Sequence, residues 1–141
     1  MAKSGKLVVD ASVVIKWYVD EEYSANALRL FEDYANGKLD LISTQLMPFE
    51  VLNALRYNPD MGVRDLTKIG ESLSNAQISL FPVLDGLYLD SIRIATEYGT
   101  TIYDSTYLSL AENVHCDLCT ADEKFVKRIG ANENLVLLKN I

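Results

Sequence analysis

The chain's 141 residues are 49% hydrophobic and 23% charged, a composition typical of one compact domain. The formal net charge of −7 argues against indiscriminate binding to phosphate backbones, which requires clustered Lys and Arg side chains. No apolar stretch approaches the roughly 20 residues of a membrane span, and MAKSGK at the N-terminus lacks the apolar core of a signal peptide. We expect a single domain over residues 1–141, with a flexible segment at residues 1–5, located in the cytoplasm and not associated with a membrane.

The first segments alternate between strand and helix patterns. LVVDA at residues 7–11 is a β-branched run typical of a buried parallel strand, and a short helical stretch to Trp17 follows it. DEE at residues 20–22 is expected to open a helix that ends at Gly37. Residues 39–42 are predicted to form the next strand. Ser43 or Thr44, which follow it, are expected to cap the next helix.

The middle of the chain continues the alternation. Pro48 suits the first turn of the helix after the second strand, and another helix is predicted over residues 63–77. ISLFPVL at residues 78–84 predicts a third strand. Two apolar stripes at helical spacing then cover residues 87–98 and 103–114.

The last third of the chain predicts a strand at residues 117–120, a helix at 123–129 ended by Gly130, and a strand at 135–138. Strands that alternate with helices favour a parallel sheet with helices on both faces. The expected fold class is α/β, a three-layer α/β/α sandwich around a mostly parallel sheet of about five strands.

Carboxylates are predicted to gather at one edge of this sheet. In open α/β sheets, ligands bind beyond the carboxyl ends of the strands. Asp10 and Asp122 follow predicted strands. Glu50 and Asp104 lie in the first turns of predicted helices that start at the same edge. Each acid taken alone is explained as well by helix capping. A buried group of carboxylates is unfavourable unless cations neutralise it, and oxygen ligands without thiols or imidazoles favour Mg²⁺ or Mn²⁺.

The cysteines of CDLCTADEKF raise the possibility of a metal or redox site. Cys116 and Cys119 have only His115 at hand as a third zinc ligand, whereas zinc needs four. An extended strand would hold the pair about 10 Å apart, too far for a disulfide. We interpret both as small buried strand residues, so the informative positions are Thr120 and Asp122, which follow them.

Four segments in order, VVDASVVIKW, PFEVLNAL, IYDSTYLSLA and LCTADEKF, resemble the PIN-domain ribonucleases, and in particular the VapC-type toxins of prokaryotic toxin–antitoxin pairs. The resemblance runs from about Leu7 to Leu138. It implies that Asp10, Glu50, Asp104 and Asp122 form the family's catalytic, metal-binding quartet. Three polar residues match supporting positions: Ser12, Asn53 and Thr120. The resemblance also implies an RNA substrate, a homodimer and a cognate antitoxin, for whose C-terminal segment an apolar groove near Trp17 would be suitable.

The expected chemistry is hydrolysis of RNA phosphodiester bonds. His115 is the only histidine, so a histidine pair for metal-free cleavage is absent from the sequence. The expected nucleophile is water activated by Mg²⁺, with Mn²⁺ as a substitute, which would leave a 3′-hydroxyl and a 5′-phosphate. Basic residues near the acids are expected to contact substrate: Lys16, Arg56 and Lys124, with Lys127 and Arg128 close by. Because they are sparse, recognition should favour a particular RNA shape or exposed loop.

Two alternatives remain open. The first is a non-catalytic PIN-like module that binds a protein and in which the acids only cap helices. The second is a phosphatase or receiver-like domain, but Asp10-Ala11-Ser12 lacks the second acid of a D-x-D phosphotransferase.

Overall fold

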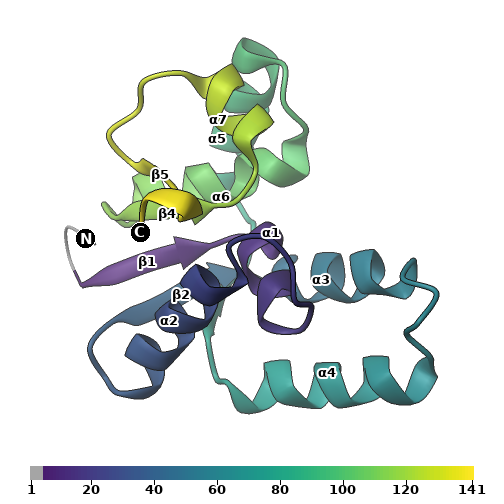
Figure 1. The fold of residues 1–141 in the computed structure, drawn as a ribbon. Coiled ribbons are helices and arrows are strands. Elements are labelled where there is room, and N and C mark those ends of the chain that lie inside the picture. The colour runs from purple at the N-terminus through teal and green to yellow at the C-terminus, as the bar shows by residue number, and fades with distance from the viewer. Residues whose placement is uncertain (1–4) are drawn as a thin grey trace.

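A computed structural model describes residues 5–141, and its five strands form one fully parallel sheet in the order β3-β2-β1-β4-β5 (Figure 1). The strands are β1 (Lys6–Val9), β2 (Asp40–Thr44), β3 (Ser79–Phe81), β4 (Asp117–Thr120) and β5 (Leu135–Leu137). The predicted parallel sheet of about five strands is confirmed. The segment predicted to be flexible, residues 1–5, lies outside the described residues apart from Gly5.

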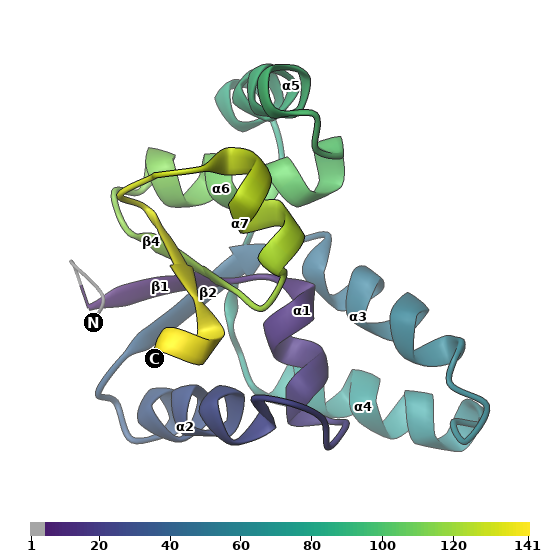
Figure 2. The same ribbon diagram turned by 45° about the horizontal axis from the view of Figure 1, so that its top comes forward.

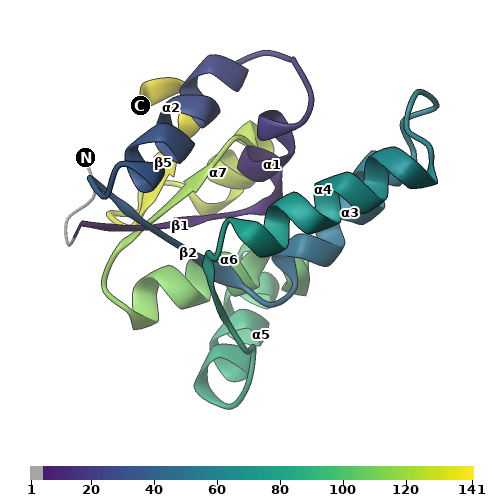
Figure 3. The same ribbon diagram turned by 90° about the horizontal axis from the view of Figure 1, so that it is seen from below.

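Helices cover both faces of the sheet, as the sandwich prediction requires. In Figure 1, α5, α6 and α7 lie on one side and α1 to α4 on the other, and Figure 3 views the molecule from below, from the side of α2 and α4. The helices are α1 (Ala11–Val14), α2 (Ser24–Ala35), α3 (Met47–Arg56), α4 (Val63–Asn75), α5 (Gly86–Tyr98), α6 (Ile102–Asn113) and α7 (Glu123–Ile129), with 3₁₀ turns η1 (Ile15–Trp17) and η2 (Leu138–Asn140). None of the helices in residues 5–141 combines the length and apolar character needed to cross a bilayer.

The central strands carry the core because both of their faces are covered. Leu7, Val8 and Val9 of β1 are at most 1% exposed, and α6 packs against β1, β2 and β4. β1 lies between β2 and β4, so the chain proceeds outward from β1 to β3 and then returns past β1 to β4. This reversal of direction creates a crevice at the carboxyl ends of β1 and β4. Figure 2 shows α1 continuing directly from that end of β1.

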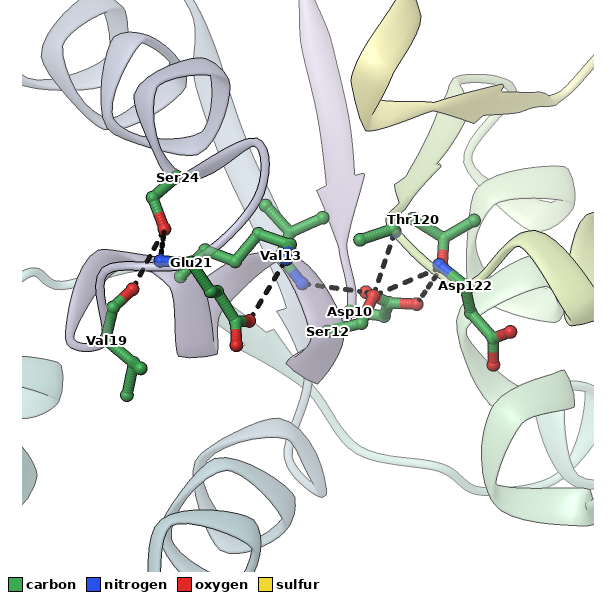
Figure 4. A network of polar contacts seen from close by, with 10 residues as sticks. Asp10, Ser12, Val13, Val19, Glu21, Ser24, Thr120 and Asp122 are labelled. Atoms are coloured by element: carbon green, nitrogen blue, oxygen red, sulfur yellow. Dashed lines mark hydrogen bonds and ion pairs between the residues drawn. The ribbon is translucent and has the colours of Figure 1, made fainter. Parts of the chain in front are cut away.

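The start of α2 differs from the prediction. The DEE segment at residues 20–22 does not open a helix; α2 begins at Ser24. The Ser24 hydroxyl donates to the Val19 carbonyl at 2.9 Å and accepts from the Glu21 amide at 3.0 Å (Figure 4). Tyr23 then has φ 65°, a left-handed conformation that no helix continues through. The turn is therefore closed by side-chain contacts before the helix starts.

The predicted cap of α3 is also wrong. Ser43 and Thr44 belong to β2, and α3 begins at Met47 after Leu46, which makes no side-chain cap. Ser43 is fully buried and its hydroxyl donates to the Val9 carbonyl at 2.6 Å, which fastens the end of β2 to the end of β1. Thr44 accepts from the Leu46 amide at 3.2 Å, so it satisfies an amide before the helix begins.

Candidate active site

Asp10 lies directly after β1 and is held by three hydrogen bonds (Figure 4). Its Oδ1 accepts from the Ser12 hydroxyl at 2.5 Å and from the Val13 amide at 3.2 Å. Its Oδ2 accepts from the Thr120 hydroxyl at 2.5 Å. The Val13 contact makes Asp10 the N-cap of α1, and the Thr120 contact joins the ends of β1 and β4. The carboxylate is therefore fixed at the mouth of the crevice.

Glu50, in the first turn of α3, is oriented by a tyrosine of α6. The Tyr107 hydroxyl donates to Glu50 Oε1 at 2.6 Å, and the tyrosine is 1% exposed. Burial and the neighbouring Glu50 carboxylate raise the pKa of Tyr107, so its hydroxyl remains a proton donor at neutral pH. Within residues 5–141, Glu50 Oε2 has no hydrogen-bond partner.

Asp104 and Asp122 complete the set of four acids. Thr101 caps α6 by accepting from the Asp104 amide at 3.0 Å, and a side-chain hydrogen bond with Thr101 opposes the rise that burial causes in the pKa of Asp104. Asp122 caps α7 by accepting from the Phe125 amide at 3.1 Å. One cavity of about 200 Å³ is lined by these acids and their neighbours: Asp10, Ser12, Glu50, Asp104, Tyr107 and Asp122. The structure thus brings four acids from four distant segments to one cavity.

The acids of this cavity are electrostatically coupled. Burial raises the pKa of Asp10 to about 6 against the hydrogen bonds that lower it, and the Asp104 charge adds to the rise. Burial also raises the pKa of Glu50 and of Asp104, with further increases from Asp104 and Asp122, respectively. Among the residues that the structure describes, none of the ion pairs involves these four acids.

The donor set of this cavity fits a hard divalent cation. In the described part of the chain, no group of three or more His, Cys, Asp or Glu side chains is arranged to hold an ion as the side chains stand. The cavity nevertheless contains carboxylate and hydroxyl oxygens and neither thiol nor imidazole, the ligand type that Mg²⁺ and Mn²⁺ prefer. Uncompensated carboxylates in a partly buried cavity favour a cation there.

The other predicted site residues are distributed around this cavity. Ser12 and Thr120 lie 3.3 Å apart beside Asp10, and the Ser12 hydroxyl also accepts from the Ala121 amide at 2.9 Å. Asn53 is exposed and lines an adjoining cavity together with Glu50 and Asp104.

The predicted substrate-binding cations occupy different places. Lys124 lines a cavity of about 290 Å³ with Asp104 and Asp122, and Arg128, one of the basic residues expected close by, lines the same cavity. Lys16 forms an ion pair with Glu21 at 3.0 Å. Arg56 lines a separate cavity on α3 and α4 that contains none of the four acids. The structure therefore places only Lys124 of the three next to the acid cavity.

The structure confirms the interpretation of the cysteines and changes that of Trp17. Cys116 and Cys119 are buried and free, and burial raises the pKa of both thiols. Trp17 packs against Phe31, with ring centroids 4.9 Å apart, and its indole donates to the Ala27 carbonyl at 2.9 Å. The indole therefore belongs to the packing of α2, although Tyr23 and Leu28 of the same region are exposed.

Comparison with known proteins identifies the family. A model of the PIN domain matches residues 7–130. The chain belongs to the PIN domain family. This PIN domain is 31% identical over 134 residues to Ribonuclease VapC3 of Pyrobaculum aerophilum, and the alignment covers 89% of this chain and 96% of that protein. The PIN domain is thus homologous to VapC ribonucleases, and the family predicted from the four motifs is confirmed.

Solved structures share the PIN fold at low sequence identity. A toxin–antitoxin complex from Klebsiella pneumoniae matches with a TM-score of 0.70 and 14% identity, over 94% of this chain and 97% of that chain. VapC20 of Mycobacterium tuberculosis, a sarcin-ricin loop cleaving toxin, matches with a TM-score of 0.69 and 13% identity, over 86% and 93% of the two chains. These likenesses show the fold alone.

Tyr107 is a site residue that the sequence analysis assigned only to the apolar stripe of its helix. We expect Tyr107→Phe to lower the unfolding free energy by about 1 to 3 kcal/mol, because it removes a hydrogen bond to a charged, half-buried carboxylate. Urea unfolding at pH 7.5 measures the change. Tyr103→Phe is the matched control, since Tyr103 is 62% exposed on the same helix. Equal unfolding free energies for the two variants would contradict the orienting role of the Tyr107 hydroxyl.

Proposed function

We propose that this PIN domain, acting as one unit over residues 1–141, is a Mg²⁺- or Mn²⁺-dependent endoribonuclease and the toxin of a type II toxin–antitoxin pair. The observation that carries the proposal is the shared cavity: four carboxylates line it and no described cation pairs with them. The 31% identity to Ribonuclease VapC3 over most of both chains supports RNA as the substrate.

Helix capping alone does not account for the four acids. Asp10 and Asp122 do cap helices, as the protein-binding alternative predicts. Asp104 does not, because the Thr101 hydroxyl occupies that role, and Glu50 is instead held by Tyr107. Glu50 and Asp104 are thus half-buried carboxylates with raised pKa values that line one cavity, which favours the enzyme over the non-catalytic module.

Asp10, Glu50, Asp104 and Asp122 are the residues that would hold the metal. A divalent cation bound there would lower the pKa of a water molecule and offset negative charge on the phosphate. Asp10 is prepared for this role by hydrogen bonds from Ser12 and Thr120, which fix its carboxylate, and Tyr107 likewise orients Glu50.

The residues around the acids would position the RNA. Lys124 and Arg128 line the cavity that adjoins Asp104 and Asp122, so they would bind a backbone phosphate next to the scissile one. Lys16 and Arg56 would contact RNA only further from the acids. In-line attack by water would leave a 3′-hydroxyl and a 5′-phosphate. A cognate antitoxin is proposed as a partner, supported by the toxin–antitoxin complexes that share the fold. A homodimer is proposed from the family resemblance.

The proposal is tested with the purified chain and a pool of structured RNAs. Cleavage should be absent in EDTA, return on addition of Mg²⁺ or Mn²⁺, and give fragments that a 3′-hydroxyl-dependent ligation accepts without prior phosphatase treatment. The readout is gel mapping of the fragment ends. Cleavage that persists in EDTA, or ends that carry a 2′,3′-cyclic phosphate, would contradict a mechanism that depends on a metal and on water.

A further inference from the structure

A second cavity, of about 640 Å³, opens between the starts of α3 and α6 and adjoins the acids. It shares Glu50 and Asp104 with the acid cavity. Its remaining lining consists of one leucine, two polar side chains and two aromatic rings: Leu46, Asn53, Thr101, Phe49 and Tyr103. We call this space the aromatic cavity. Its volume is within the range of cavities that bind small organic molecules.

The two rings of the aromatic cavity are unusually exposed. Phe49 is 73% exposed and Tyr103 is 62% exposed. Neither takes part in a ring contact among residues 5–141, where Phe31 with Trp17 and with Tyr34 provides the ring pairs. Each ring directly precedes an acid of the site in the sequence, so helix geometry holds it at the rim of the catalytic crevice. Exposed aromatic rings at such a position favour a ligand with a flat face.

The charge of the aromatic cavity decides what kind of ligand suits it. Glu50 and Asp104 are its only charged lining residues, and no Lys or Arg lines it. It is therefore unsuited to a phosphate, which would be repelled. A neutral base with exocyclic amino donors is suited to it, since the Asn53 amide oxygen accepts hydrogen bonds and the cavity carries no positive charge that favours a phosphate. Asn53 is exposed, and its side chain has no hydrogen-bond partner in the described part of the chain.

We propose that the aromatic cavity holds one unstacked nucleobase of the RNA, next to the phosphate at the four acids, with Phe49 and Tyr103 stacking on the base and Asn53 contacting its edge. The inference rests on the proposed function. It explains how an acidic protein selects RNA: a splayed-out base provides binding that does not depend on clustered positive charge. It also gives the crevice a direction, with a base on the α3 side and a phosphate at Lys124 and Arg128 on the α7 side.

The test measures binding of a short fluorescein-labelled single-stranded RNA by anisotropy in Ca²⁺, and its cleavage in Mg²⁺. Stacking of a base on an aromatic side chain changes affinity by about 5- to 150-fold. Phe49→Ala and Tyr103→Ala should each weaken RNA binding by a factor in this range. Phe49→Trp keeps an aromatic ring at this position and should bind RNA about as well as the wild type. Tyr57→Ala is the matched control, because Tyr57 is 75% exposed at the end of the same helix but does not line the cavity.

A set of RNAs in which each nucleotide in turn is abasic locates the base. One abasic position should weaken wild-type binding by the same factor, and Phe49→Ala should lose that sensitivity, since ring and base act as a pair. Asn53→Leu should reduce the preference among the four bases at that position. Unchanged RNA affinity in both alanine variants overturns the proposal. Variants that weaken binding of a partner protein but not of RNA also overturn it, because the occupant is then a protein side chain.

The outcomes separate this inference from the nuclease function. If the wild type cleaves RNA and the aromatic variants behave like it, the base site is wrong and the nuclease function stands. If the wild type binds RNA in a ring-dependent way without cleaving it, the base site stands and the nuclease function is wrong. A wild type that neither binds nor cleaves RNA overturns both.

Discussion

Asp10→Asn is expected to abolish RNA cleavage and at the same time to stabilise the metal-free protein. Burial raises the pKa of Asp10 from 3.8 to about 6, so at neutral pH the fold carries a carboxylate whose ionisation opposes folding. This pKa difference corresponds to about 3 kcal/mol. Asparagine removes the charge and keeps most of the hydrogen bonds, so we expect the unfolding free energy in EDTA at pH 7.5 to rise by about 2 kcal/mol.

The loss of activity has a different cause from the gain in stability. Asparagine retains the shape of the side chain but removes the negative charge that would hold the cation, so cleavage should fall by about 10³-fold or more. Cleavage rates in Mg²⁺ and urea unfolding in EDTA measure the two effects. Asp20→Asn is the matched control, because it changes the net charge by the same amount at an exposed position. It should alter neither the cleavage rate nor the unfolding free energy. A less stable Asp10→Asn variant would contradict the prediction and favour the view that Asp10 is only a helix cap.

The sequence predicted the fold and the position of the acids because both depend on local patterns. β1 contains the buried apolar run Leu7, Val8 and Val9, and all of β4 is buried. Asp10 follows β1 directly and Asp122 lies two residues after the end of β4, so the sheet topology brings both to the crevice. Asp10 and Asp122 could therefore be located from strand ends alone. The same reasoning located Glu50 and Asp104 from helix starts.

Contacts between distant side chains were not predictable from such patterns. Tyr107 occupies an apolar position of α6, and spacing alone does not reveal that its hydroxyl meets Glu50, 57 residues away in the sequence. Lys16 follows Asp10 closely, but its side chain turns to Glu21. The exposure of Phe49 likewise depends on what packs nearby, although an aromatic residue directly before each of two helix-start acids was a visible signal.

Adding Mn²⁺ is expected to reverse the pH dependence of stability at this site. Without metal, the folded state binds more protons than the unfolded state between pH 3.8 and about 6, because folding raises the pKa of Asp10. Asp10 therefore destabilises the fold as the pH rises through this range, and stability increases as the pH falls. The pKa values of Glu50 and Asp104 are also raised, so they contribute with the same sign.

Metal binding requires the ionised carboxylates, so the proton and Mn²⁺ compete for Asp10. We expect the dissociation constant for Mn²⁺ to rise about tenfold for each pH unit below the pKa of Asp10. As binding weakens, the stabilisation of the fold by Mn²⁺ should disappear. Thermal unfolding in EDTA and in Mn²⁺ at pH 4.5, 6.0 and 7.5, which bracket the pKa of about 6, measures both curves. The difference between wild type and Asp10→Asn removes contributions from other groups, such as Glu123, whose pKa is lowered by Lys139. A stabilisation by Mn²⁺ that is equal at pH 4.5 and 7.5 would place the ion away from Asp10, because a cation held by that carboxylate has to displace its proton.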